Sequence, residues 1–232
     1  MARGWKIQER RHAGEEHLDA EAAARFDEKS PFDPSTEIDT LLELGLTGED
    51  TVVDFGTGTG VFPLAAAEYC DRVVAVDVSE SMVKIVDEKI EATSIQNIET
   101  VHDGFLSYDH QGDAAAYAFS KDALHHLPDF WKVEALKAIG TTLEEGGMLR
   151  LRDFVFSFDP QDSQAAIESW LDDKRSTSFT EEELHVHFRE EFSTYGFLLE
   201  QMLAEAGFEI IDATYETDFY AEYTCQWHGF TE

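Results

Sequence analysis

From Thr51 onward, short strand-like runs alternate with stretches in which apolar residues recur at helical spacing. The runs predict five strands, at residues 51–55, 72–77, 98–103, 114–119 and 148–155. The stretches between them predict helices at residues 61–69, from the N-cap Ser79 onward, and from near Pro128 to a point before Gly146-Gly147, with Leu143 on the last of these. Such alternation is typical of βαβ units and indicates an α/β fold with a mainly parallel sheet.

The first part of the chain has no strand-like pattern. Apolar residues at i, i+4 and i+8 predict one helix over residues 14–29, and a second helix begins at Asp33-Pro34-Ser35 and ends at Gly45. We interpret residues 1–46 as an N-terminal helical cap.

The C-terminal part differs from the βαβ core. A helix closed by Gly207 precedes two strands, Phe208–Thr214 and Asp218–Trp227, whose link is too short for a crossover, so antiparallel pairing is expected. Residues 157–194 form an acidic and aromatic insertion, in which Thr180 and Glu183 match a capping box. The pattern therefore predicts one domain over residues 47–232 with a cap inserted at 157–194, and the length of 232 residues agrees with a single core.

The charge balance is strongly acidic. The chain has 49 Asp and Glu against 17 Lys and Arg, a formal net charge of −32 spread along most of its length. Repulsion of that size destabilises a compact fold unless salt screens it, and the screening length falls to about 3 Å near 1 M salt. The composition resembles that of proteins from extreme halophiles. It also argues against a nucleic-acid partner, because phosphate binding requires a basic surface.

Other composition features narrow the class of protein. No apolar run approaches the roughly 20 residues of a membrane span, and the N-terminus lacks the apolar stretch of a secretory signal, so a cytoplasmic protein that does not enter the membrane is expected. Cys70 and Cys225 are the only cysteines; they are too few for a disulfide framework and lack the spacing of a zinc site. No metal is therefore expected.

The strongest chemical signal is Asp54-Phe55-Gly56-Thr57-Gly58-Thr59-Gly60, where the first strand meets the first helix. Glycines there allow a sharp turn and a close approach to a ligand. A dinucleotide fingerprint would need G-x-G-x-x-G, but Val61 and Pro63 stand where the third glycine would fall. A nicotinamide-dependent oxidoreductase is therefore disfavoured.

The D-x-G-x-G-x-G loop resembles the first motif of class I S-adenosylmethionine-dependent methyltransferases. The sequence after the fourth predicted strand, Leu124-His125-His126-Leu127-Pro128-Asp129, resembles the "LHHLPD" stretch of the small-molecule branch related to quinone-biosynthesis enzymes, and it differs from the N-P-P-Y motif of many DNA and protein amide methylases. Leu143–Leu149 resembles the family's L-x-P-G-G turn, with Glu145 where proline is usual. The resemblance implies a Rossmann-like fold with a seven-stranded, mainly parallel sheet, an antiparallel last strand and helices on both faces.

The same resemblance implies S-adenosyl-L-methionine as the cofactor and suggests its contacts. Asp54 would contact the amino group, Asp77 would accept bonds from the ribose hydroxyls, and Asp103 would accept a bond from the adenine amino group. These acids end three consecutive strands, and ligands of open α/β sheets bind at that edge. The expected cofactor-binding residues are Asp54, Gly56, Thr57, Gly58, Gly60, Asp77, Val78, Met82, Asp103, Gly104, Phe105 and Ser120.

The acceptor side is less well defined by the sequence. Methyl transfer is an in-line displacement that needs alignment more than a base, but His125 or His126 is the candidate if the acceptor must lose a proton. Asp153, His187, Arg189, Glu190 and Tyr195 are candidate acceptor-binding residues. The expected partner is a small-molecule methyl acceptor. A protein or RNA acceptor, a non-catalytic module that binds the cofactor or its product, and a homodimer are left open.

Overall fold

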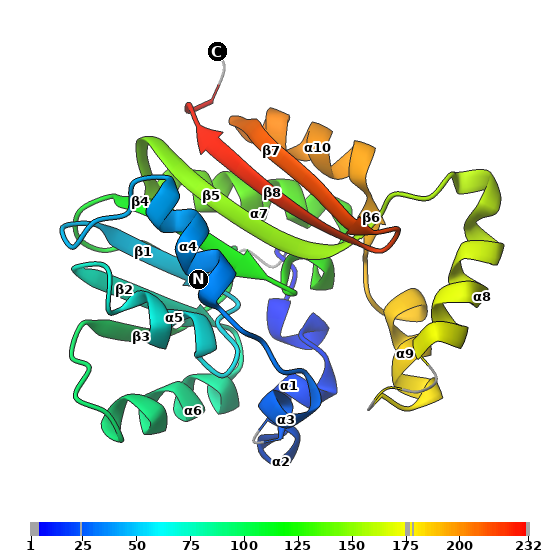
Figure 1. The fold of residues 1–232 in the computed structure, drawn as a ribbon, viewed down its shortest axis with the longest axis horizontal. Coiled ribbons are helices and arrows are strands. Elements are labelled where there is room, and N and C mark those ends of the chain that lie inside the picture. The colour runs from blue at the N-terminus through cyan, green and yellow to red at the C-terminus, as the bar shows by residue number, and fades with distance from the viewer. Residues whose placement is uncertain (1–4, 24, 175–176, 178, 231–232) are drawn as a thin grey trace.

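The structure is a computed structural model that describes residues 5–23, 25–174, 177 and 179–230. Figure 1 shows a central twisted sheet with helices on both faces and two helical extensions beyond one edge. Within the described residues, no helix is long and apolar enough to cross a lipid bilayer.

The sheet has the strand order β3-β2-β1-β4-β5-β8-β7, with the two-residue strand β6 pairing beside β5. Strands β1 to β5 pair parallel to one another, β8 is antiparallel to both β5 and β7, and so the predicted single antiparallel last strand is confirmed. The strands are β1 (Thr51–Phe55), β2 (Arg72–Asp77), β3 (Ile98–His102), β4 (Ala115–Lys121), β5 (Leu143–Phe156), β6 (Thr194–Tyr195), β7 (Phe208–Thr217) and β8 (Tyr220–Trp227).

Helices bury both faces of this sheet in two apolar clusters. Because side chains alternate along a strand, Val52 of β1 faces one cluster and Val53 the other. The first cluster lies under α4 and α5, and the second lies under α7 and α10. The longer helices are α4 (Ser35–Glu43), α5 (Val61–Ala66), α6 (Glu80–Glu91), α7 (Asp129–Thr142), α8 (Ser163–Lys174), α9 (Glu181–Arg189) and α10 (Gly196–Glu205).

The predicted helix over residues 14–29 is wrong as a continuous element. The structure has three short helices there, α1 (Glu15–Leu18), α2 (Ala20–Ala23) and α3 (Phe26–Lys29). Asp19 interrupts the first two, because its carboxylate accepts the backbone N–H of Glu21 at 3.0 Å. Two backbone carbonyls that would accept helical hydrogen bonds in a continuous helix accept side-chain hydroxyls instead. The Ser79 hydroxyl donates to the His17 carbonyl, and the Ser81 hydroxyl donates to the Leu18 carbonyl.

Two further corrections concern β5 and the insertion. Leu143 does not end the preceding helix but begins β5, where it pairs with Ala115 across a bulge. The insertion contains α8, which the sequence pattern did not predict, as well as α9, whose Thr180–Glu183 capping box is confirmed. Phe154, Trp170 and Phe219 are in ring contact with one another and so anchor the insertion to the end of the sheet.

Candidate active site

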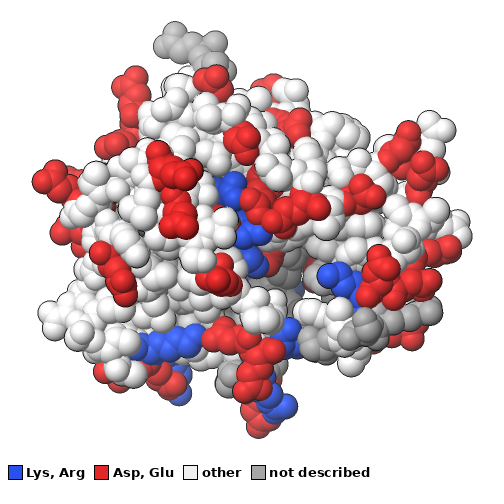
Figure 2. Space-filling model, viewed as in Figure 1, with Lys and Arg blue, Asp and Glu red and all other residues white. Residues whose placement is uncertain are grey.

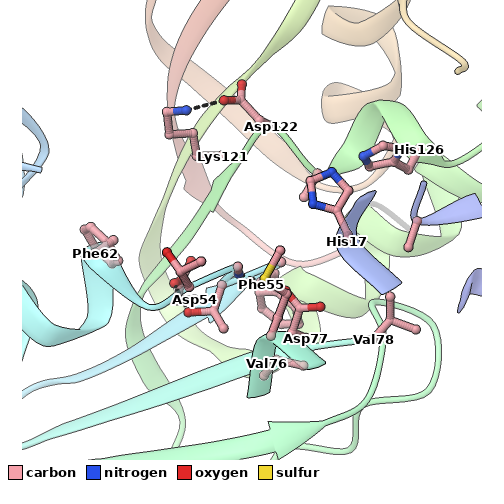
Figure 3. Close-up of a pocket in the computed structure, with 18 of the residues that line it drawn as sticks. His17, Asp54, Phe55, Phe62, Val76, Asp77, Val78, Lys121, Asp122 and His126 are labelled. Carbon is pink, nitrogen blue, oxygen red and sulfur yellow. Dashed lines mark hydrogen bonds and ion pairs between the residues drawn. The ribbon is translucent and has the colours of Figure 1, made fainter. Parts of the chain in front are cut away.

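A cavity lies where the parallel strands β1, β2 and β4 end, together with the turn that follows β3. Its walls come from the glycine loop after β1, the ends of β2 and β4, the turn at Asp103–Phe105 and the N-terminal segment. Figure 3 shows Asp54 and Asp77 on one side of this cavity and His17 and His126 on another. We call it the first cavity.

The glycine loop bends sharply because its glycines adopt positive φ angles and have no Cβ. Gly56 has φ +73°, and a Cβ at this position would lie only 2.4 Å from the Cβ of Ala123. Gly58 also has a positive φ, and its backbone N–H donates to Asp77 at 2.8 Å, so the loop is tied to the end of β2. Gly60 differs from the prediction: it caps α5 against Val86 and does not line the first cavity.

Two buried carboxyl groups face this loop. Asp54 is 2% exposed and accepts a hydrogen bond from the Thr57 hydroxyl at 2.5 Å. Burial raises the pKa of Asp54 to about 7, and the nearby charge of Asp77 acts in the same direction. Burial also raises the pKa of Asp77 to about 6, although it accepts backbone bonds from Gly58 and Ser79. The site therefore holds two acids that ionise more readily when a cation or hydroxyl donors join them.

The turn after β3 forms the opposite wall. Asp103 accepts bonds from the Gly104 N–H and the Ser107 hydroxyl, and Phe105 stacks on Phe55 with ring centroids 5.6 Å apart. The apolar side chains of Val78 and Met82 complete this wall of the first cavity. An apolar slot flanked by a carboxylate suits a planar aromatic base with an exocyclic amine.

Ser120 lies outside the first cavity. Its side chain is fully buried, and its hydroxyl donates to the Phe55 carbonyl at 2.9 Å. This contact joins β4 to β1, so the structure places Ser120 behind the site and not in its wall.

A second cavity, of about 1210 Å³, adjoins the first. The N-terminal helices line one side of it, and α8, α9 and the β7–β8 turn line the other. Both cavities share several lining residues, namely His17, Phe26, Ser30, Phe32, Lys121, Asp122 and His126. A ligand in the first cavity therefore faces a ligand in the second across this shared boundary.

Comparisons with known proteins match the part of the chain that contains most of the first cavity's walls. Residues 52–147, which include the glycine loop and the strand ends, match a family described as "Methyltransferase domain". This part of the chain is similar to that domain, and its cofactor is S-adenosylmethionine. The glycine loop, the two buried acids, the apolar slot and the acid beside it all line the first cavity.

Several known proteins are similar to the chain over most of its length. Carboxy-S-adenosyl-L-methionine synthase of Nautilia profundicola is 24% identical over 72% of this chain and 74% of its own length. An uncharacterized methyltransferase of Exiguobacterium sibiricum is 29% identical over 71% of both chains. The crystal structure of the N-methyltransferase NodS from Bradyrhizobium japonicum, in complex with S-adenosyl-L-homocysteine, shares the fold with a TM-score of 0.62 at 13% identity, over 95% of this chain and 98% of that one.

The adjacent histidines His125 and His126 have different surroundings. His125 is buried, lies outside the first cavity, and has its Nδ1 bonded to Asp153. Burial opposes its charged form, but Asp153, with Glu191 and Asp122, raises the pKa of His125 to about 9. His126 lines both cavities, and its buried Nδ1 has no hydrogen-bond partner among the described residues. Burial and the charge of His125 lower the pKa of His126 well below its usual range.

The predicted acceptor-binding residues separate into two groups. His187 lines the second cavity, and Asp153 reaches it only through His125. Arg189 is exposed and pairs with Glu182, Glu190 is exposed, and Tyr195 packs against Phe156; none of these three lines either cavity.

Sequence reasoning missed several residues that line the first cavity. Glu9, His17 and Asp27 belong to the N-terminal segment, and burial raises the pKa of Glu9 to about 7. No motif marks them, because their positions depend on how this segment folds over the sheet. Lys121 and Asp122 directly follow the predicted residue Ser120, so their position at the end of β4 could have indicated them from the sequence. Asp122 has φ +51°, a backbone conformation that is uncommon outside glycine and is often found at functional sites.

Proposed function

We propose that this methyltransferase transfers the methyl group to a small molecule held in the second cavity. The observation that supports the proposal is the shared boundary between the two cavities. Bound S-adenosylmethionine supplies an electrophilic methyl group to a nucleophile held in line with it. The cap helices α8 and α9 and the N-terminal helices enclose a space suited to a small acceptor rather than an open groove for a protein or RNA.

The roles proposed for the cofactor-site residues follow from their positions. The carboxylate of Asp54 binds the amino group of the cofactor, and that of Asp77 accepts hydrogen bonds from the ribose hydroxyls. The adenine ring lies between Val78 and Phe105, and Asp103 accepts a hydrogen bond from its amino group. The loop at Gly56–Gly58 lets the backbone approach the ligand closely.

His126 is the residue we propose to accept a proton from the acceptor. It stands on the boundary between the cavities, and its Nδ1 has no hydrogen-bond partner in the described part of the chain. His125 is a poorer candidate for this role, because it does not line the first cavity and its Nε2 lies 3.4 Å from Glu191.

The proposed acceptor class is an aromatic compound of the quinone-precursor type. Two observations support it: the LHHLPD resemblance, and aromatic side chains in the wall of the second cavity. These are Phe32, Phe154, Trp170, Phe179, Phe219 and Tyr220. The halophilic origin is proposed on the charge of −32 alone.

The test begins with calorimetry of the full chain against S-adenosyl-L-homocysteine and, separately, NAD. We expect heat only with the first ligand; heat only with NAD would overturn the cofactor assignment. Phenolic and quinol acceptors are then screened with S-adenosylmethionine by mass spectrometry of both acceptor and cofactor. A methylated acceptor supports the proposal. Turnover only on protein or RNA, or a modified cofactor without methylated acceptor, contradicts it.

A further inference from the structure

Two histidines and a glutamate meet in the wall of the second cavity. His125 lies on a short helix (Leu124–His126) after β4, His187 lies on α9, and Glu191 follows that helix. One ligand atom from each lies within 4.8 Å of the others. His125 Nε2 is 3.4 Å from Glu191 Oε2, and His187 Nδ1 contacts the same carboxylate oxygen.

Asp153 fixes the orientation of His125. One of its oxygens bonds to Nδ1 of the ring, and the other accepts the backbone N–H of His125 at 2.9 Å. The remaining ring nitrogen, Nε2, is therefore directed at Glu191. A carboxylate behind a histidine is the usual arrangement for orienting a metal-bound imidazole.

His187 is held in place by aromatic packing. Its ring stacks on Phe154 with centroids 5.1 Å apart and meets the edge of Trp170. The side chains of His125 and Glu191 are 6% and 8% exposed and that of His187 is 26% exposed, so the cluster is shielded but open on one side. That side is the second cavity, which all three residues line.

We propose that His125, His187 and Glu191 bind one divalent transition-metal ion of the zinc class. Two imidazoles and one carboxylate suit zinc and its neighbours in the first transition series, whereas Mg²⁺ and Ca²⁺ prefer oxygen ligands. Adjacent ligand atoms of a tetrahedral zinc ion are about 3.3 Å apart, so only small side-chain rotations are needed. Three protein ligands leave a coordination position directed into the cavity.

A role of the metal ion in binding the methyl acceptor rests on the proposed function, whereas metal binding itself does not. A hydroxyl or thiol of the acceptor would occupy the open position and be polarised there beside His126. The sequence did not indicate this site, because His125 lies 62 positions before His187 and the i,i+4 pair of His187 and Glu191 supplies only two of the three ligands.

The test is metal binding by the chelator-treated full chain. We expect about one equivalent of Zn²⁺ per chain, retained after dialysis and measured by elemental mass spectrometry, and a visible d–d spectrum with Co²⁺. His187→Ala and Glu191→Gln should each weaken binding more than about tenfold, and Asp153→Asn by roughly 10- to 100-fold. His185→Ala, on the same helix, and Glu190→Gln, beside the third ligand, are matched controls that should bind like the wild type.

Absence of retained Zn²⁺ and of a Co²⁺ spectrum in the wild-type chain would overturn the proposal. So would equal weakening in the control variants, which would place the ion elsewhere. Circular dichroism establishes that each variant is folded, and S-adenosyl-L-homocysteine is titrated into the same samples. If the metal binds but this ligand does not, the methyltransferase proposal fails and the metal site stands.

Discussion

The protonation state of the Asp54 carboxyl group depends on whether a cationic ligand is bound beside it. Burial raises its pKa to about 7, so without a ligand it is partly protonated at neutral pH. A ligand ammonium binds the ionised form, and protons compete with it. Affinity for S-adenosyl-L-homocysteine should therefore rise with pH up to about 7, by up to about tenfold per pH unit below that value, and then level off.

Asp54→Asn tests this reason directly. An amide cannot become the carboxylate, so affinity at pH 8 should fall by about 10- to 100-fold, as expected for a lost charge-assisted hydrogen bond. The pH dependence due to this group should disappear, and near pH 5 the variant should bind about as well as the wild type. Asp212→Asn, on the exposed face of β7, is the control in the same calorimetric series. An unchanged pH profile in Asp54→Asn would exclude Asp54 as the titrating group.

His126 gives a prediction that separates catalysis from cofactor binding. His126→Ala should lower turnover by about 10²- to 10⁴-fold, the usual contribution of a general base, with the affinity for S-adenosyl-L-homocysteine kept. His228→Ala, at an exposed pair with Glu209, serves as the control. Steady-state rates and calorimetry measure the two effects; full activity of the His126 variant would end the assignment.

Among the secondary-structure elements, α4 depends on one buried charge. Glu37 is fully buried on this helix and binds Arg150 at 2.7 Å and Arg152 at 2.6 Å, both on β5. Glu222 of β8 contacts the same two arginines. The network therefore ties a helix that precedes the sheet to two adjacent strands.

Removing one partner from such a network leaves buried charge unpaired. Glu37→Gln should destabilise the folded chain by about 3–5 kcal/mol. The exposed Glu43 lies on the same helix, and Glu43→Gln should change stability by less than about 0.5 kcal/mol. Chemical denaturation of both variants measures the difference, and equal midpoints would show that the network contributes nothing net.

Acidic side chains outnumber basic ones on the face of the molecule that Figure 2 shows. Figure 2 shows Asp and Glu spread over most of the visible face with few Lys and Arg between them. This arrangement fits the net charge of −32, and no single patch accounts for it.

Screening of this surface should stabilise the fold. Raising potassium chloride from about 0.1 M to about 1 M shortens the screening length from about 10 Å to about 3 Å. The melting temperature should rise by several degrees, since each kcal/mol corresponds to about 2–4 °C at this chain length. Differential scanning fluorimetry measures the shift, and sucrose at equal osmolality is the uncharged control. A melting temperature independent of salt would contradict both the screening argument and the proposed halophilic origin.

The α/β class, the strand positions and the cofactor loop could be predicted from local pattern. Apolar periodicity reports which side of an element is buried, and parallel strands end at one sheet edge, so the sequence alone predicts that Asp54, Asp77 and Asp103 lie close together. These features depend on neighbours in the sequence or on a rule common to all open α/β sheets.

Contacts between distant segments could not be predicted in this way. The division of residues 14–29 into three helices depends on Ser79 and Ser81, and the different surroundings of His125 and His126 depend on Asp153 and on the insertion. No spacing in the chain encodes such pairs, because which segments meet is set by the packing of the whole fold. The family motif therefore indicated the cofactor site, while the second cavity and the His125–His187–Glu191 cluster emerged only from the folded chain.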